Sequence, residues 1–210
     1  MNYLAHITLA RHSDRAMVGA MLGDFVKAND VDNYPPEIAR EITLHRLIDS
    51  YTDSHPAVVA SRELFGAGRR RYAGIVLDVF YDYLLSRDWA LYCAVPREAL
   101  IARFYGALTR HEATLPARLR EMLPYLIEQD WLGGYASFEG VAHTVARVSR
   151  RLSRNGHLLR EGIDDLIVHR DTIARGFDRF FPELVAFATA RRAELAAVDK
   201  LSTYPLTSLS

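Results

Sequence analysis

The chain has 210 residues, enough for one domain with a sizeable core or at most two small domains. Half of its residues are hydrophobic and a quarter are charged, as in an ordinary globular protein. Because 26 basic residues balance 26 acidic ones, the composition provides no bulk attraction to nucleic acid or to a membrane.

The single cysteine, Cys93, excludes an intramolecular disulfide and suits a reducing compartment. The N-terminal stretch MNYLAHITLARHSD has no basic segment before its short apolar run, which argues against a secretory signal. No stretch approaches 18 uninterrupted apolar residues, so we expect no transmembrane helix. These features favour a cytoplasmic protein.

Apolar residues recur with helical spacing along nearly the whole chain. Prolines and glycines mark most of the expected boundaries. A loop is expected over NDVDNYPP. The expected helices are Ser13 or Asp14 to about Lys27, Pro35 to before Pro56, Pro56 to the glycines of FGAGRRR, about Tyr72 to Trp89, Arg97–Ala113, Ala117–Gln129, Phe138–Asn155, Gly162–Phe180, and one that begins at Pro182.

The chain shows no strand-like alternation, phosphate-binding glycine loop or internal repeat. Its last ten residues, LSTYPLTSLS, carry no charge and include a proline, which predicts a loose tail. We therefore predict an all-α fold, with one compact domain of about eight or nine helices over residues 1–197 and a tail over residues 198–210.

Two pairs of polar side chains interrupt the expected helices. His45 and Asp49 are four residues apart, and so are Asp78 and Asp82, so each pair projects from one helix face. An unpaired buried charge is costly, so acids within an apolar helix must face something polar. A divalent cation bound by carboxylate oxygens and an imidazole would satisfy this need.

Asp24 in GDF and His6 in NYLAH could each complete a coordination shell. Arg46 follows His45 directly, and an arginine beside a histidine ligand suits a phosphate site because the guanidinium can bind two oxygens. The alternative for each acid is a surface carboxylate paired with an arginine. His45 could equally be a core histidine that donates to a backbone carbonyl. For the whole set we favour a metal site.

Two basic clusters could bind an acidic partner or a phosphate, although either could be solvated surface. One is a stripe at helical spacing on the expected helix Phe138–Asn155: Arg147, Arg150, Arg151 and Arg154. The other precedes the helix of Asp78 and Asp82: Arg69, Arg70 and Arg71. We expect the second to matter more, because it immediately precedes the helix that carries Asp78 and Asp82. Arginines at a helix N-terminus also oppose the helix dipole, which favours a phosphate or partner contact there.

Six motifs occur in order along the chain: NYLAH at 2–6, GDFV at 23–26, YPPE at 34–37, HRLIDSYTD at 45–53, LDVFYDYLLSRDW at 77–89 and DWLGGY at 130–135. As a series they resemble the bacterial acyl carrier protein phosphodiesterases, also called acyl carrier protein hydrolases. The resemblance extends to about Leu195. It implies a remote relationship to the HD metal-dependent phosphohydrolases, which are all-helical.

The resemblance also implies a reaction. The family removes the 4′-phosphopantetheine arm from holo acyl carrier protein, an acidic protein, with a metal-activated water. Mn²⁺ is the favoured cation, with Mg²⁺ also possible. The chain lacks the adjacent His-Asp dyad of typical HD enzymes, so the ligand set rests on helix spacing and motif position rather than on those enzymes.

The predicted metal ligands are Asp24, His45, Asp49, Asp78 and Asp82. The predicted catalytic residues are His6, Arg46, Asp49 and Asp82, with His6 or an acid as general acid or base and Arg46 balancing phosphoryl charge. The predicted substrate-binding residues are Arg46, Arg69, Arg70 and Arg71. Two alternatives are an HD-type phosphohydrolase acting on a nucleotide or other small phosphate ester, and a non-catalytic helical binding module.

Overall fold

The computed structural model describes residues 3–202, apart from the side chains of residues 199–202, and every regular element in that range is helical. Nine of its α-helices have seven residues or more, which confirms the prediction of an all-α domain with eight or nine helices. None of the described helices is both long and apolar enough to cross a membrane.

The N-terminal part consists of α1 (Tyr3–Leu9), α2 (Asp14–Leu22) and α3 (Pro36–Ser54), with a 3₁₀ turn, η1 (Ala28–Asn33), before α3. Ser13 caps α2, because its side chain accepts the N–H of Ala16. Gly19 allows α2 to pack closely on α3, since a Cβ there would lie 2.6 Å from the carbonyl oxygen of Ile38.

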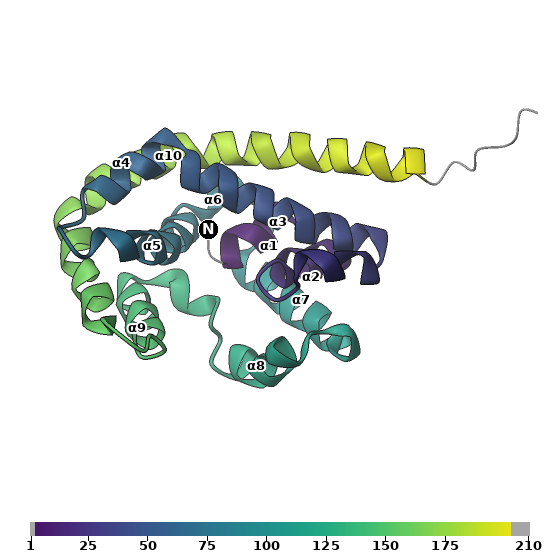
Figure 1. The fold of residues 1–210 in the computed structure, drawn as a ribbon, viewed down its shortest axis with the longest axis horizontal. Helices are drawn as coiled ribbons and strands as arrows, with labels where there is room; N and C mark the ends of the chain where they lie inside the picture. Colours follow the sequence, from purple (N-terminus) through teal and green to yellow (C-terminus); the bar gives the residue numbers. More distant parts are fainter. Residues whose placement is uncertain (1–2, 203–210) are drawn as a thin grey trace, which may run out of the picture.

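The remaining helices are α4 (Pro56–Glu63), α5 (Ala73–Arg87), α6 (Trp89–Tyr92), α7 (Arg97–Arg110), α8 (Ala117–Glu128), α9 (Phe138–Ser149) and α10 (Gly156–Ser202), with 3₁₀ turns η2 (Arg70–Tyr72), η3 (Glu112–Thr114) and η4 (Gly133–Ala136). Most of them lie to the left of the N-terminal part and below it in Figure 1, and α10 runs along its top. Figure 1 shows α8 and α9 on the side of the molecule opposite the C-terminal half of α10.

Two helices end earlier than their sequence pattern predicts, and α1 was not predicted. After α2, the N–H groups of Phe25 and Val26 both donate to the carbonyl of Leu22, so the chain turns before Lys27. After α9, Asn155 adopts a left-handed conformation with φ of 59°. The single-face arginine stripe is therefore wrong: Arg147 belongs to α9, whereas Arg150 is its C-cap, and Arg151 and Arg154 lie beyond it.

The predicted break at Pro182 is also wrong, because α10 continues through it. Proline removes one backbone hydrogen bond, which costs free energy in a helix. Phe180, Phe181 and Leu184 are fully buried on both sides of it, and this burial offsets the lost bond. Since α10 extends to Ser202, the start of the predicted tail is helical; residues 203–210 lie outside the described range.

The short helix α1 is bound at both ends by distant side chains. At its N-terminus, the buried carboxylate of Asp82 accepts the N–H groups of Leu4 at 2.8 Å and Ala5 at 3.0 Å. At its C-terminus, Arg192 of α10 donates to the carbonyl of Leu9 at 2.9 Å. Each charge has the sign that the helix dipole favours at its end.

Arg192 also binds both carboxylate oxygens of Glu41 in α3, at 2.6 and 3.0 Å. Only 3% of the Glu41 side chain is exposed, and a bidentate pair is the geometry that best compensates a buried carboxylate. One guanidinium thus connects α10 with both α1 and α3.

We expect Arg192→Ala to lower the free energy of unfolding by about 3 kcal/mol, because it leaves the Glu41 carboxylate buried and releases the Leu9 carbonyl. His12 Nε2 lies 3.9 Å from Oε1 of Glu41, but burial lowers the pKa of His12, so this imidazole is uncharged at neutral pH and does not replace the guanidinium. Denaturant unfolding measures the change. The matched control is Arg191→Ala, whose exposed pair with Glu194 should contribute less than about 1 kcal/mol. Equal losses of unfolding free energy in the two variants would show that the buried Arg192–Glu41 pair contributes no more than an exposed pair.

Candidate metal site

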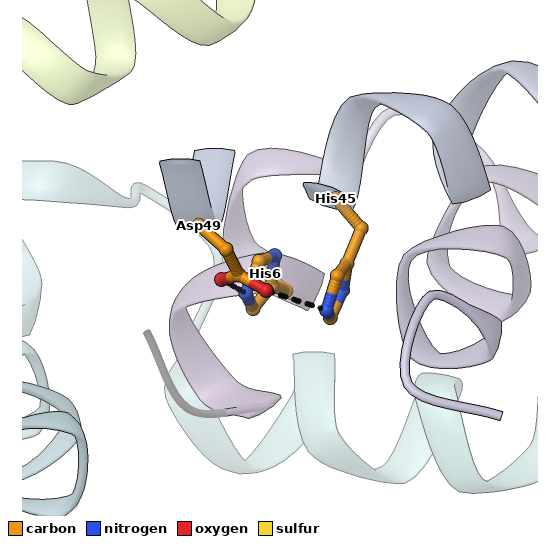
Figure 2. Close-up of side chains that lie close together, drawn as sticks. All are labelled: His6, His45 and Asp49. Atoms are coloured by element: carbon orange, nitrogen blue, oxygen red, sulfur yellow. Dashed lines mark hydrogen bonds and ion pairs between the residues drawn. The ribbon is translucent and has the colours of Figure 1, made fainter. Parts of the chain in front are cut away.

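Four side chains from three segments meet between α1, α2 and α3. His6 comes from α1, Asp24 follows α2, and His45 and Asp49 come from α3. Figure 2 shows His6, His45 and Asp49 directed toward one another. The imidazoles are 1% and 2% exposed, whereas the Asp24 and Asp49 side chains are 49% and 39% exposed. The site is therefore buried on its histidine side and open on its carboxylate side.

Asp49 connects the two histidines. Its Oδ1 lies 3.1 Å from Nε2 of His6, and its Oδ2 lies 3.1 Å from Nε2 of His45. Asp24 Oδ1 approaches the same His45 nitrogen at 3.3 Å. The two imidazole rings are stacked, with centroids 3.8 Å apart. Within residues 3–202, only His6, His45 and Asp49 form a set of three whose candidate ligand atoms all lie within 4.8 Å of one another.

The orientation of His45 is fixed by its other nitrogen. Nδ1 lies 2.7 Å from the carbonyl oxygen of Ala20, and because a carbonyl can only accept, Nδ1 carries the proton. Nε2 therefore faces Asp24 and Asp49, but neither contact has the direction of a hydrogen bond, so this buried nitrogen has no hydrogen-bond partner. The negative charge of the two carboxylates can be balanced either by a proton on Nε2 or by a metal cation bound between them.

The pKa values reflect this charge arrangement. Burial acts to lower the pKa of His45, but the close carboxylates of Asp24 and Asp49 outweigh it and raise the pKa to about 9. Burial and the adjacent His45 lower the pKa of His6 to about 4. Burial acts to raise the pKa of Asp49, but His45 and His6 hold it well below its usual range. At neutral pH both acids are ionised and His6 is uncharged.

Gly23 leaves the space that the His45 ring occupies. A Cβ at position 23 would lie 2.1 Å from Cγ of His45, closer than any real contact. Only glycine fits at this position of the GDF motif, because any side chain would overlap the imidazole. The next residue of the motif, Asp24, lies beside the same imidazole.

Three of the predicted metal ligands, Asp24, His45 and Asp49, thus lie together with His6. Asp82 has a different contact set: it binds the backbone at the start of α1, and burial raises its pKa to about 7. It is therefore a helix cap that positions His6, and the structure does not bring it together with the cluster of His6, His45 and Asp49. Burial raises the pKa of Asp78, and the charge of Asp49 contributes to the rise.

The predicted arginines are mostly engaged elsewhere. Arg46 donates to the carbonyl of Val26 at 2.6 Å, which holds the chain after Asp24 against α3. Arg69 forms a two-point ion pair with Asp165 of α10, at 2.6 and 2.8 Å. Arg70 donates to the Glu63 carbonyl, and the Arg71 guanidinium lies over the Tyr72 ring. Asp53, another acid in the HRLIDSYTD motif, pairs with Arg62 as an ordinary surface carboxylate would.

A different set of arginines lies near the site. The guanidiniums of Arg147 and Arg151 lie 4.0 and 5.6 Å from the Trp131 ring centre, and that of Arg118 lies 5.6 Å from Phe25. Among the described residues, none of the three has a carboxylate within ion-pair distance.

These arginines lie close enough to Tyr3, which is one turn before His6 in α1, for their charges to affect its pKa. Burial and the charge of Asp24 raise the pKa of Tyr3 to about 12, and the positive charges of Arg118, Arg151 and Arg147 act against the rise. The sequence had indicated Arg147 and Arg151 as part of a basic stripe, but it gave no signal for Arg118 or for the nearness of all three to Tyr3, which depends on how the helices pack.

Comparisons with known proteins agree over most of the chain. Residues 1–184 match the family described as acyl carrier protein phosphodiesterase. Curated proteins named acyl carrier protein phosphodiesterase from Salmonella dublin, Salmonella agona and Salmonella newport are each 34% identical over 194 residues, which is 92% of this chain and 100% of the relative. No solved structure matches.

We expect Gly23→Ala to displace the His45 ring and so to weaken any binding of Mn²⁺ at this candidate site by at least about tenfold, because ligand positions tolerate little movement. Calorimetric titration of the purified variant measures the affinity, and circular dichroism reports whether the helices are kept. Gly134→Ala is the control, since a Cβ there meets nothing within 4 Å. Wild-type affinity in Gly23→Ala would show that the close contact is not what orients the imidazole.

Proposed function

We propose that this chain, which belongs to the acyl carrier protein phosphodiesterase family, hydrolyses the phosphodiester between 4′-phosphopantetheine and a serine of holo acyl carrier protein. The products would be apo acyl carrier protein and 4′-phosphopantetheine. The observation that best supports the proposal is the buried Nε2 of His45, which has no hydrogen-bond partner and faces Asp24 and Asp49.

The proposal includes a divalent cation, Mn²⁺ by preference. His6, His45 and Asp49 would bind it, with Asp24 beside His45, since imidazoles and carboxylates are ligands that suit such ions. The cation would replace the proton that His45, with its pKa of about 9, otherwise carries at neutral pH. When bound, the cation supplies a Lewis acid that polarises the phosphoryl oxygens and lowers the pKa of water. The hydrogen bond from His45 Nδ1 to Ala20 fixes the ring so that Nε2 faces the site, a common arrangement for histidine ligands.

The protein contributes further through charge and position. His6 has a pKa of about 4 and is neutral at pH 7, the state in which an imidazole can bind a cation or accept a proton. The two half-exposed carboxylates leave the site open to a phosphodiester that arrives from solvent. Arg46 holds the Val26 carbonyl, so its role is to position the segment that carries Asp24.

The structure changes which arginines we propose for the carrier protein. Arg69 is paired with Asp165, whereas Arg147 and Arg151 lie over the Trp131 ring without a carboxylate partner. The charges of Arg147, Arg151 and Asp24 all affect the pKa of Tyr3, so the two arginines lie on the same side of the molecule as the metal site. Guanidiniums held on an aromatic ring keep their charge available for an acidic partner. We therefore place the docking surface for the acidic carrier protein at Arg147 and Arg151.

We expect Asp24→Ala, His45→Ala and Asp49→Ala each to reduce hydrolysis of holo carrier protein by at least about 100-fold, because each removes a ligand. Intact-mass measurement after chelation and addition of Mn²⁺ or Ca²⁺ follows the loss of the arm. Mn²⁺ should restore the wild type better than Ca²⁺, a weaker Lewis acid. Asp88→Ala, which only loses a surface pair with Arg87, is the control. Full activity in two of the three variants at limiting Mn²⁺ would remove this site from the reaction.

We expect the double variant Arg147→Glu, Arg151→Glu to reduce kcat/KM on holo carrier protein by about tenfold or more and to weaken its dependence on salt concentration. The control is Arg70→Glu, Arg71→Glu, which reverses the same number of charges on η2. Steady-state kinetics at several ionic strengths separate the two. A larger loss in the control would return the docking surface to the arginines that precede α5.

A further inference from the structure

A pocket of about 500 Å³ lies next to the metal site, between the chain that follows α2 and the chain that precedes α8. Its apolar walls include Phe25, Tyr34, Leu115 and Pro116. The volume falls within the range of about 300–1,000 Å³ that small-molecule sites occupy. The mixture of aromatic, aliphatic and polar side chains is also typical of such sites.

The chain itself and one hydrogen bond connect this pocket to the metal site. Phe25 and Val26 line the pocket and directly follow Asp24. Arg46, which directly follows His45, donates to the Val26 carbonyl at 2.6 Å. One wall of the pocket is therefore fixed to α3, the helix that carries His45, and it begins one residue after Asp24.

The chemistry of the lining selects a neutral ligand. One acid, Asp30, and one base, Arg120, contribute no net charge, and an acid beside an isolated phosphate would be unfavourable. Asn33 and Thr114 offer both donors and acceptors, which match amide groups. Phe25 and Tyr34 offer flat surfaces for methylene and methyl groups. A chain that alternates amides with short aliphatic segments meets each of these features.

We infer that this pocket binds the pantetheine arm of the substrate while its phosphate lies at His45 and Asp49. The inference rests on the proposed function. The arm and the serine of the carrier protein are attached to different oxygens of the phosphate, so the arm can enter the pocket while the carrier protein contacts Arg147 and Arg151.

The test compares two exposed alanines four residues apart. Ala117 lines the pocket, and Ala113 does not. Ala117→Trp should fill the pocket and raise KM for holo carrier protein by about tenfold, with a smaller effect on kcat. Ala113→Trp should stay close to the wild type. Pantetheine, which lacks the phosphate, should inhibit the wild type competitively and should inhibit Ala117→Trp about tenfold more weakly.

Thermal unfolding of both variants shows whether Ala117→Trp is folded, and Thr114→Trp fills the same pocket if it is not. The inference is overturned if the pocket-filling variants match Ala113→Trp in KM and in inhibition by pantetheine, or if pantetheine does not compete with holo carrier protein. Failure of the proposed function would look different, because the wild type itself would then release no phosphopantetheine in the presence of Mn²⁺.

Discussion

The site depends on the way in which a seven-residue helix is held in place. A helix as short as α1 is unstable alone, because its nucleation cost exceeds what a few hydrogen bonds return. Asp82 binds the N–H groups at its start, and Arg192 binds a carbonyl at its end. These contacts from α5 and α10 fix the position of His6, and Arg192 also orients α3 through Glu41.

This arrangement places charge where water is scarce. His45 is nearly buried, yet two carboxylates approach its Nε2, so the protein alone has an excess of negative charge at this point. A proton on His45 is one solution, and it accounts for a pKa of about 9. A divalent cation is the other solution, and the same two carboxylates would attract it. The geometry that raises the pKa is therefore also the geometry that suits a metal ion.

The arginines divide into two groups by their partners. Arg69 and Arg192 bind carboxylates of other helices, so their charges are neutralised by ion pairs that connect one element with another. Arg147, Arg151 and Arg118 lie on aromatic rings instead, which orders the guanidinium without neutralising it. Sequence position does not separate the groups, because both contain arginines that appear in basic clusters.

The sequence by itself determined the all-α class, most helix starts at proline or serine, and the shared face of His45 and Asp49, since these follow from helical periodicity and local capping. Its ordered motifs also indicated the family. Only the tertiary structure decided that His6 joins this pair from 43 residues away, and that Asp82 caps a helix rather than joining them. Helix spacing reports on neighbours three or four residues apart, whereas these contacts depend on how separate helices pack.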